Sequence, residues 1–258
     1  LYGLMILGDM YPLALPETML GIPDRGWWII LLFVYAFFAS LLPVWVLLQP
    51  RDYINGLQLF VGLILLYASF LVVRPEVVAP AMRDSVPDGT PGIFPLLFVT
   101  VACGAISGFH GIVASGTSSK QLDKETDARF VGYFGAVGEG LLALGTIVAT
   151  TAGFRTVMEW EEIYNKWNAG GVDAFIEGGG RLMHDGLGIP TSLSGTILAT
   201  MAVLFAATTM DSGVRLQRLV VAEIGDLMGV KLSGLVATLI AVGCALGLTF
   251  STGVDGSG

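Results

Sequence analysis

The sequence predicts an all-α protein that crosses a membrane several times, and its composition carries the first part of that prediction. The chain has 258 residues, of which 13 are Lys or Arg and 21 are Asp or Glu. Hydrophobic residues make up 54% of the chain, and the mean hydropathy is +0.75. A soluble domain carries charge on about a quarter of its residues. At 13%, this chain has too few charges to cover a surface in water, which excludes a soluble enzyme, a disordered tail and a nucleic-acid binder with a basic face.

The second observation is that the few charges bound six long apolar windows. These windows are 25–51, 52–74, 88–120, 129–155, 185–211 and 231–255, and between their limits lie 25, 21, 31, 25, 25 and 23 residues, interrupted only by Glu139. About 20 helical residues cross the hydrocarbon core of a bilayer. Backbone amides find no water there, which leaves helices or a closed barrel, and the window 29–39 shows no strand-like alternation. We therefore predict about six transmembrane helices in a single domain over residues 1–258.

Two windows carry signs of interruption. Pro43 removes a backbone donor and predicts a break in the first window. The window 88–120 is too long for one straight crossing, and its second half is dense in Gly, Ser and Thr. The charged pair Arg51–Asp52 is expected to form the connector between the first and second helices.

Two polar segments are expected to be short interfacial helices. Thr156 and Glu159 stand at the spacing of a capping box, which predicts a helix start that is closed by Gly170 and Gly171. The segment 212–228 alternates apolar and charged residues with helical period and is expected to lie along the cytoplasmic surface. Asp211 directly precedes it and could cap its first amides.

Polar side chains inside the apolar windows are the candidates for function, because burying them in lipid is costly and they usually face a bundle interior or a water path. Glu139 is the sharpest case, about ten residues inside its window between Gly138 and Gly140. Two roles fit: binding of a coupling proton or other ion, and a neutral acid that hydrogen-bonds to a neighbouring helix.

The interrupted window supplies further candidates. Transporters use the free amides and carbonyls of broken helices to hold ions and substrate carboxylates. The candidate substrate- and ion-binding residues here are Ser107, His110, Ser115, Thr117 and Ser118. The alternative is a kink packed against other helices, with His110 bonded to a backbone carbonyl.

Asp211 is the last candidate ion-binding residue. It ends the fifth window, and Arg215 stands four residues further on, at the spacing of a helical ion pair. A plain capping role is equally compatible with its position. Two histidines and two isolated cysteines, Cys103 and Cys244, predict neither a metal site nor a disulfide framework, and no cofactor is expected.

Several stretches resemble the carbon starvation protein A (CstA) family. The two long ones are LPVWVLLQPRDY at 42–53 and ACGAISGFH at 102–110, the latter continued by SGTSSKQL at 115–122. Weaker similarities are YFGAVGEGLL at 133–142 and TTMDSGVRL at 208–216. The matches follow family order over roughly residues 27–250. The chain departs from the family pattern at Gly111, where a polar residue is expected, and at Met210, where Ile or Leu is expected.

This resemblance implies a multi-pass carrier of the cell inner membrane. The family takes up peptides under carbon limitation, and some members carry pyruvate with protons. Family chains are longer, so this chain is expected to lack helices at both ends. The resemblance therefore implies secondary active uptake of peptides or a small carboxylate such as pyruvate, coupled to protons or sodium. The alternative is a membrane sensor or assembly subunit that transports nothing. Neither hypothesis is enzymatic, and the expected partners are the lipid bilayer, the substrate and the coupling ion, without nucleic acid.

Overall fold

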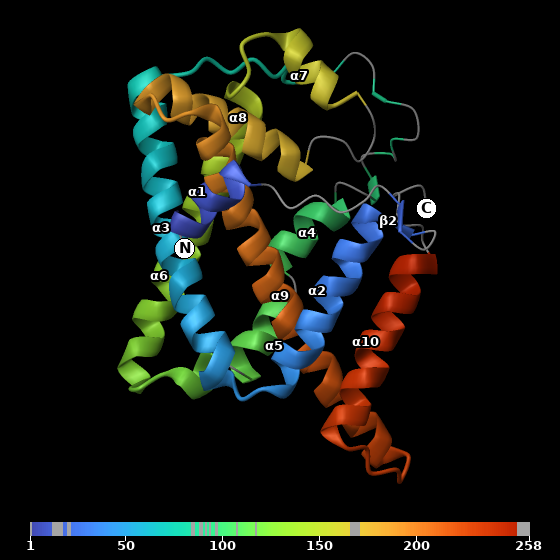
Figure 1. The fold of residues 1–258 in the computed structure, drawn as a ribbon. Helices are drawn as coiled ribbons and strands as arrows, with labels where there is room; N and C mark the ends of the chain where they lie inside the picture. The colour runs from blue at the N-terminus through green and yellow to red at the C-terminus, as the bar shows by residue number, and fades with distance from the viewer. Residues whose placement is uncertain are drawn as a thin grey trace. The chain divides into compact units, whose positions relative to one another are not determined.

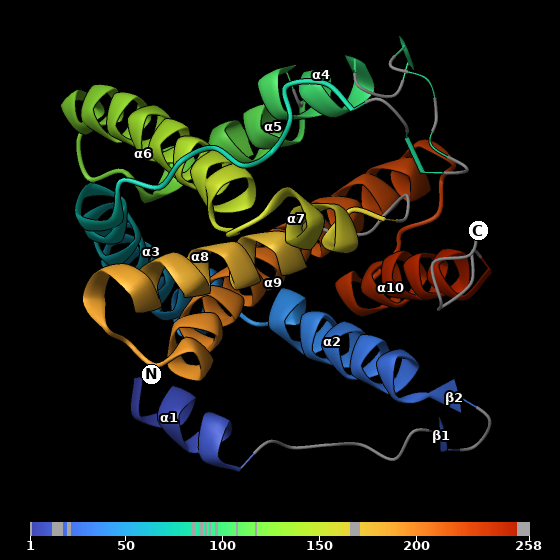
Figure 2. The same ribbon diagram turned by 90° about the horizontal axis from the view of Figure 1, so that it is seen from above.

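The computed structural model describes residues 2–11, 18–19, 22–83, 86–87, 90, 92, 94–95, 98–106, 108–116, 118–165 and 171–251. Helices account for nearly all of it (Figures 1 and 2). They are α1 (Tyr2–Met10), α2 (Asp24–Leu41), α3 (Val44–Val73), α4 (Phe98–Ile106), α5 (Gly108–Gly116), α6 (Glu125–Ala152), α7 (Val157–Ile163), α8 (Gly171–Leu187), α9 (Thr191–Leu227) and α10 (Gly234–Ser251), with the 3-10 turn η2 (Ser118–Gln121). Strands β1 (Thr18–Met19) and β2 (Ile22–Pro23) pair antiparallel, with Thr18 opposite Pro23.

Five helices of the described chain are long and apolar enough to cross a membrane. They are Asp24–Leu41, Trp45–Val73, Glu125–Ala152, Thr191–Leu227 and Gly234–Ser251. The prediction of an all-α multi-pass membrane protein is thus confirmed. The sixth window, 88–120, holds α4 and α5, two helices of nine residues each. Neither is long enough to cross alone, and the described part of this window contributes no candidate span.

The chain divides into two compact units, which we describe separately. The first comprises residues 1–9 and 59–200, and the second comprises residues 10–58 and 201–258. The three boundaries fall inside α1, after Asp9, inside α3, after Gln58, and inside α9, after Thr200.

Two connectors predicted from charge are continuous helix instead. Pro43 ends the first span, as predicted: α2 stops at Leu41 and α3 begins at Val44. The prediction of a connector at Arg51–Asp52 was wrong, because α3 runs through both residues to Val73. The prediction of a separate surface helix at 212–228, capped by Asp211, was also wrong, because α9 continues from Thr191 to Leu227. Arg51, Asp211, Arg215 and Arg218 each contact a group on another helix, so these charges are accommodated without a helix end.

The core of the second unit is where α2, α9 and α10 meet. Ala36, Val214 and Val242 are buried there, and Phe33, Phe37, Met210 and Leu246 pack around them. Both ribbon views show α2 and α10 side by side (Figures 1 and 2). Met210 and Val214 lie on either side of Asp211 in the sequence. This packing therefore fixes the part of α9 that carries the Asp211 carboxylate.

The first unit is built on a close contact between α6 and α8. A Cβ atom added to Gly178 of α8 would overlap the carbonyl oxygen of Ala149 in α6. A Cβ on the next residue, Gly179, would lie 2.7 Å from the Leu198 side chain. Gly178, Gly179 and Gly180 are all buried. Small residues let membrane helices approach until their backbones touch, and α8, which the sequence analysis did not predict, uses its glycines in this way.

Helix α7 begins with half of the predicted capping box. The Thr156 hydroxyl oxygen accepts a hydrogen bond from the Glu159 amide at 3.2 Å. The Glu159 carboxylate does not return to the Thr156 amide but accepts from the Arg155 amide at 3.1 Å. It also takes a hydrogen bond of 2.8 Å from Arg181. The helix ends at Ile163, earlier than predicted, and α8 starts at Gly171.

The Arg155 amide, together with the guanidinium groups of Arg181 and Arg155, holds the pKa of the Glu159 carboxyl below its ordinary value of 4.5. A lowered folded-state pKa means that the folded protein favours the ionised form. The interaction is therefore fully present above the ordinary pKa and is lost as the pH falls through the lowered one.

We predict that replacing Gly178 by Ala destabilises the first unit by about 1–3 kcal/mol, because the added methyl group overpacks the contact with α6. The free energy of unfolding is to be measured by SDS titration in mixed micelles. Gly140→Ala on α6 is the matched control, since a Cβ there meets nothing within 4 Å among the described residues. Equal stability of the two variants would contradict the proposed backbone contact.

We also predict that Glu159→Gln lowers the thermal midpoint at neutral pH and that this difference from the wild type shrinks as the pH falls below about 4.5. Midpoints measured between pH 3.5 and pH 7 test this. Glu161→Gln removes an exposed acid from the same helix and should show no such trend. A wild-type advantage of the same size at pH 7 and at the lowest pH would rule out the ionised carboxylate as its source.

Candidate functional site

The second unit contains a buried polar cluster formed by α3 and α9, and α9 also contributes to its apolar core. On α3, Arg51 and Asn55 are four residues apart and so lie on one face of the helix. On α9, Thr208, Asp211 and Arg215 likewise lie on one face. The Asn55 side-chain amide donates to the Thr208 hydroxyl at 3.2 Å, which joins the two faces.

Asp211 is the centre of the cluster. Its side chain is 0% exposed, and its Oδ2 atom accepts a hydrogen bond of 3.3 Å from the Arg51 guanidinium group. Its Oδ1 atom lies 3.6 Å from Nε of Arg215. The two arginine side chains are only 12% and 13% exposed. The predicted ion pair between Asp211 and Arg215 is confirmed, and Arg51 adds a second cation that the sequence analysis did not assign to this site.

Arg51 is further held by two neighbours. Its Nη1 atom donates to the hydroxyl group of Tyr35 on α2 at 2.8 Å. Its Nη2 atom lies 3.7 Å from the carboxylate of Asp52, whose side chain is 42% exposed. The cluster thus places two buried guanidinium groups around one fully buried carboxylate, with a second carboxylate at its rim.

Two arginines of α9 also donate hydrogen bonds to the end of α2, where the helix is broken. Pro43 has no N–H group, so the carbonyl of Ala39, four residues earlier, lacks the donor that a continuous helix would supply. Arg215 donates to this carbonyl at 2.5 Å and to that of Leu42 at 3.0 Å. Arg218 donates to the carbonyl of Ser40 at 2.6 Å. At the break between α2 and α3, these carbonyl groups therefore accept hydrogen bonds from side chains.

Several buried atoms of the cluster make no hydrogen bond within the described part of the chain. They are Nε of Arg51, Nε of Arg215, Oδ1 of Asp52, Oδ1 of Asn55 and Oδ1 of Asp211. Buried polar atoms are normally paired, and each one left unpaired costs about 1–3 kcal/mol. The Nε–H group of Arg51 is therefore available to donate to an oxygen atom of a ligand, whereas that of Arg215 faces Oδ1 of Asp211 at 3.6 Å.

The candidates from the interrupted window lie in the first unit. His110 is exposed on α5, where its ring contacts Phe109 edge to face. The Ser115 hydroxyl donates to the Ile112 carbonyl of its own helix at 3.1 Å. Ser118 is exposed in η2. Ser107 and Thr117 lie outside the described residues.

Glu139 is exposed on α6, which is the least covered of the long helices. Only 6% of its apolar window is buried, against 22–28% in the other four spanning helices of the described chain. Glu139 lies on the same face as Gly132 and Gly135, which are seven and four residues earlier. No hydrogen bond or ion pair joins it to another described side chain.

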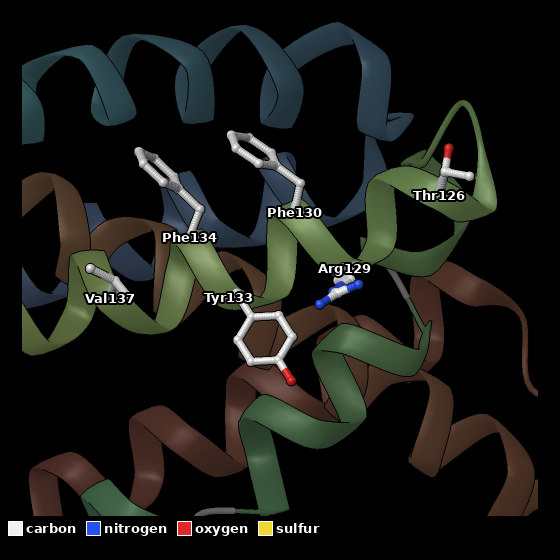
Figure 3. A pocket seen from close by; sticks show the side chains of 6 residues that line it. All are labelled: Thr126, Arg129, Phe130, Tyr133, Phe134 and Val137. Carbon is white, nitrogen blue, oxygen red and sulfur yellow. The ribbon is translucent and has the colours of Figure 1, made fainter.

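A hollow of about 600 Å³ follows a different face of α6. Thr126, Arg129, Phe130, Tyr133, Phe134 and Val137 line it. Figure 3 shows that all six side chains come from this one helix, with Phe130 and Phe134 projecting together; their rings stack at 5.3 Å. Glu139 is nine residues from Phe130, which places it half a helical turn away from that ring, so the hollow and the acid belong to different surfaces.

A signal in the sequence could have revealed the cluster. Arg51, Asn55 and Gln58 repeat at helical spacing, as do Thr208, Asp211 and Arg215. The first pattern was missed because Arg51 was taken as the boundary of an apolar window. The second was seen only as a pair, because the helix was expected to end at Asp211.

Comparison with known proteins gives a family. The family model "Carbon starvation protein CstA" matches residues 5–158. The pyruvate/proton symporter BtsT of Escherichia coli is 46% identical over 123 residues, which are 45% of this chain and 17% of the relative. The peptide transporter CstA of Bacillus subtilis is 42% identical over 150 residues, covering 57% of this chain and 23% of the relative.

A longer match is found with the peptide transporter CstA of Helicobacter pylori, at 31% identity over 265 residues, covering 81% of this chain and 38% of the relative. No solved structure matches. The chain thus spans between about a sixth and two fifths of the length of these curated relatives. With a family model that matches more than half of its residues, this multi-pass membrane protein belongs to the carbon starvation protein CstA family.

Proposed function

We propose that this chain acts in secondary active uptake of peptides or a small carboxylate such as pyruvate across the cell inner membrane, coupled to protons. One observation carries the proposal. Asp211, between two arginines, is a fully buried ionised group on a helix long and apolar enough to span a membrane. Such groups are costly in a membrane protein and mark paths of substrates and ions.

The names of the relatives support the same function. They refer to peptide transport and to pyruvate/proton symport. Transport of this kind needs a buried site for a polar solute and an acid that can exchange a proton. The cluster around Asp211 supplies buried polar groups, and Glu139 supplies a second acid within a spanning helix.

Glu139 has the position expected of a coupling site. It lies in the middle of α6, and the glycines on its face leave room for a neighbouring helix to approach. A proton or a sodium ion bound there would neutralise the carboxylate as it passes through a medium of low dielectric constant. His110, Ser107, Ser115, Thr117 and Ser118 are proposed to contribute to the substrate path in the first unit.

Uptake into vesicles tests the function. The 258-residue chain is reconstituted, and labelled pyruvate or a labelled dipeptide is supplied under an imposed pH gradient or, separately, a sodium gradient. We expect accumulation above the external concentration under the pH gradient and its collapse on addition of a protonophore. Protein-free vesicles are the control. Absence of accumulation under every gradient would refute the proposal.

The variant Glu139→Gln tests the coupling site in the same vesicles. A glutamine keeps the size of the side chain but carries no exchangeable carboxyl proton, so we expect accumulation against the gradient to be abolished. Glu125→Gln, which removes an exposed acid from the first turn of the same helix, should accumulate substrate like the wild type. Wild-type accumulation by Glu139→Gln would refute the assignment of this residue.

A further inference from the structure

We propose that Arg51 and Arg215 bind the carboxylate group of the transported molecule, and that Asp211 occupies these two guanidinium groups while no carboxylate is bound. The inference rests on the proposed function, because it names the chemical group by which that site recognises its substrate. It assigns a binding role to two residues of the second unit.

The geometry shows that the two arginines converge on one carboxylate. Arg51 approaches Oδ2 of Asp211 at 3.3 Å from α3, and Arg215 approaches Oδ1 at 3.6 Å from the next turn of α9. The Nε atoms of both arginines are buried and make no hydrogen bond with any described residue. A guanidinium group binds a carboxylate most strongly through two parallel N–H groups. Arg51 therefore keeps an N–H group that the Asp211 carboxylate does not use, and Nε of Arg215 faces Asp211 at a distance longer than a hydrogen bond.

Neighbouring groups hold Arg51 in place for a ligand. The Tyr35 hydroxyl accepts from Nη1, so one end of the guanidinium group is tied to α2. Asn55 is 6% exposed and is tied to Thr208 through its amide nitrogen, while its Oδ1 atom is unpaired among the described atoms. An arginine fixed in this way loses little freedom when a ligand arrives, which favours binding.

The ligand class follows from the site. Two buried cations with free N–H groups select an anion with at least two oxygen atoms. Pyruvate and a peptide with a free carboxyl terminus differ in size and in nearly every other group, but they share a carboxylate. A site that recognises only the carboxylate fits both of the substrates named for the relatives.

We infer that binding at this site is accompanied by uptake of a proton. An incoming carboxylate would compete with Asp211 for the same guanidinium groups, and repulsion between two carboxylates so close favours protonation of one of them. One proton taken from the aqueous phase converts the Asp211 carboxylate to the neutral acid, and its hydrogen bonds with the arginines pass to the substrate oxygens. The charge of the cluster is the same before and after, because one proton and one anion enter together.

Among the described ionisable groups of the cluster, Asp211 is the only carboxyl group whose side chain is fully buried, and we assign the proton to it for that reason. Asp52 lies at the rim and is partly exposed, Arg51 and Arg215 remain cationic, and Tyr35 accepts a hydrogen bond from Arg51. Arg218 is bound to the Ser40 carbonyl. Helix α10, packed on α2, contributes no charged residue, and its Cys244 is exposed.

Equilibrium binding to the whole chain in nanodiscs tests the carboxylate site. The probes are labelled pyruvate and its neutral isostere pyruvamide, and dialanine and its carboxyl-terminal amide. We expect each carboxylate to bind at least tenfold more tightly than its amide. Amides that bind as tightly as the acids would overturn the proposal, and this comparison on the wild type needs no variant to fold.

Variants then assign the residues. Arg51→Gln is expected to weaken pyruvate binding at least tenfold, while Arg51→Lys, which keeps the charge, recovers part of it. Arg25→Gln, which removes an exposed arginine at the start of α2, should leave binding unchanged. Pyruvate affinity of Arg51→Gln or Arg215→Gln within twofold of the wild type would overturn the assignment.

Calorimetry in two buffers of different ionisation heat measures the proton. We expect Asp211→Asn to take up one proton fewer per pyruvate bound than the wild type, with pyruvate affinity that depends less on pH. Proton uptake that is unchanged in Asp211→Asn would overturn the role of Asp211. Binding without vesicle uptake would refute the proposed transport alone, and uptake of acid and amide at equal rates would refute the carboxylate site alone.

Discussion

The position of an ionised carboxylate inside an apolar helix bundle governs the second unit. Asp211 can stay charged there only because Arg51 and Arg215 approach it from two sides. This requirement explains why α3 and α9 continue through charged residues instead of ending at them. It also explains why Met210 and Val214, on either side of Asp211, pack so closely with α2 and α10: the pairing distances hold only if the helices that carry the charges are fixed.

The first unit follows a different principle. Its helices pack closely because glycines leave room for the neighbouring chain: Gly178 and Gly179 allow α8 to approach Ala149 and Leu198. On α7 and α8, Arg181 links Glu159 with Glu177. The polar groups inside its spanning segment are few, and Glu139 on the sparsely covered α6 is the outstanding one.

Composition and apolar windows were enough to predict an all-α membrane protein and the break at Pro43, because both depend on properties local to the chain. The partners of Arg51 were not predictable in this way. Its contact with Asp211 joins residues 160 positions apart, and a charge that ends a window looks the same whether it faces water or a buried carboxylate. Helix α8 was missed because its three successive glycines suggest a turn, and only contact with α6 makes them favourable in a helix. His110 and Ser115 were chosen by residue type, yet the Ser115 hydroxyl is satisfied by its own helix.

The end of α2 has a mechanical consequence. Where α2 is broken at Pro43, the carbonyls of Ala39 and Ser40 accept hydrogen bonds from Arg215 and Arg218 rather than from the backbone. A change of angle between α2 and α3 would therefore act on these side-chain hydrogen bonds, and the long arginine side chains could follow the moving carbonyls. Since Arg215 contacts both the joint and Asp211, a change in what this arginine binds would be transmitted directly to the angle at which the two helices meet.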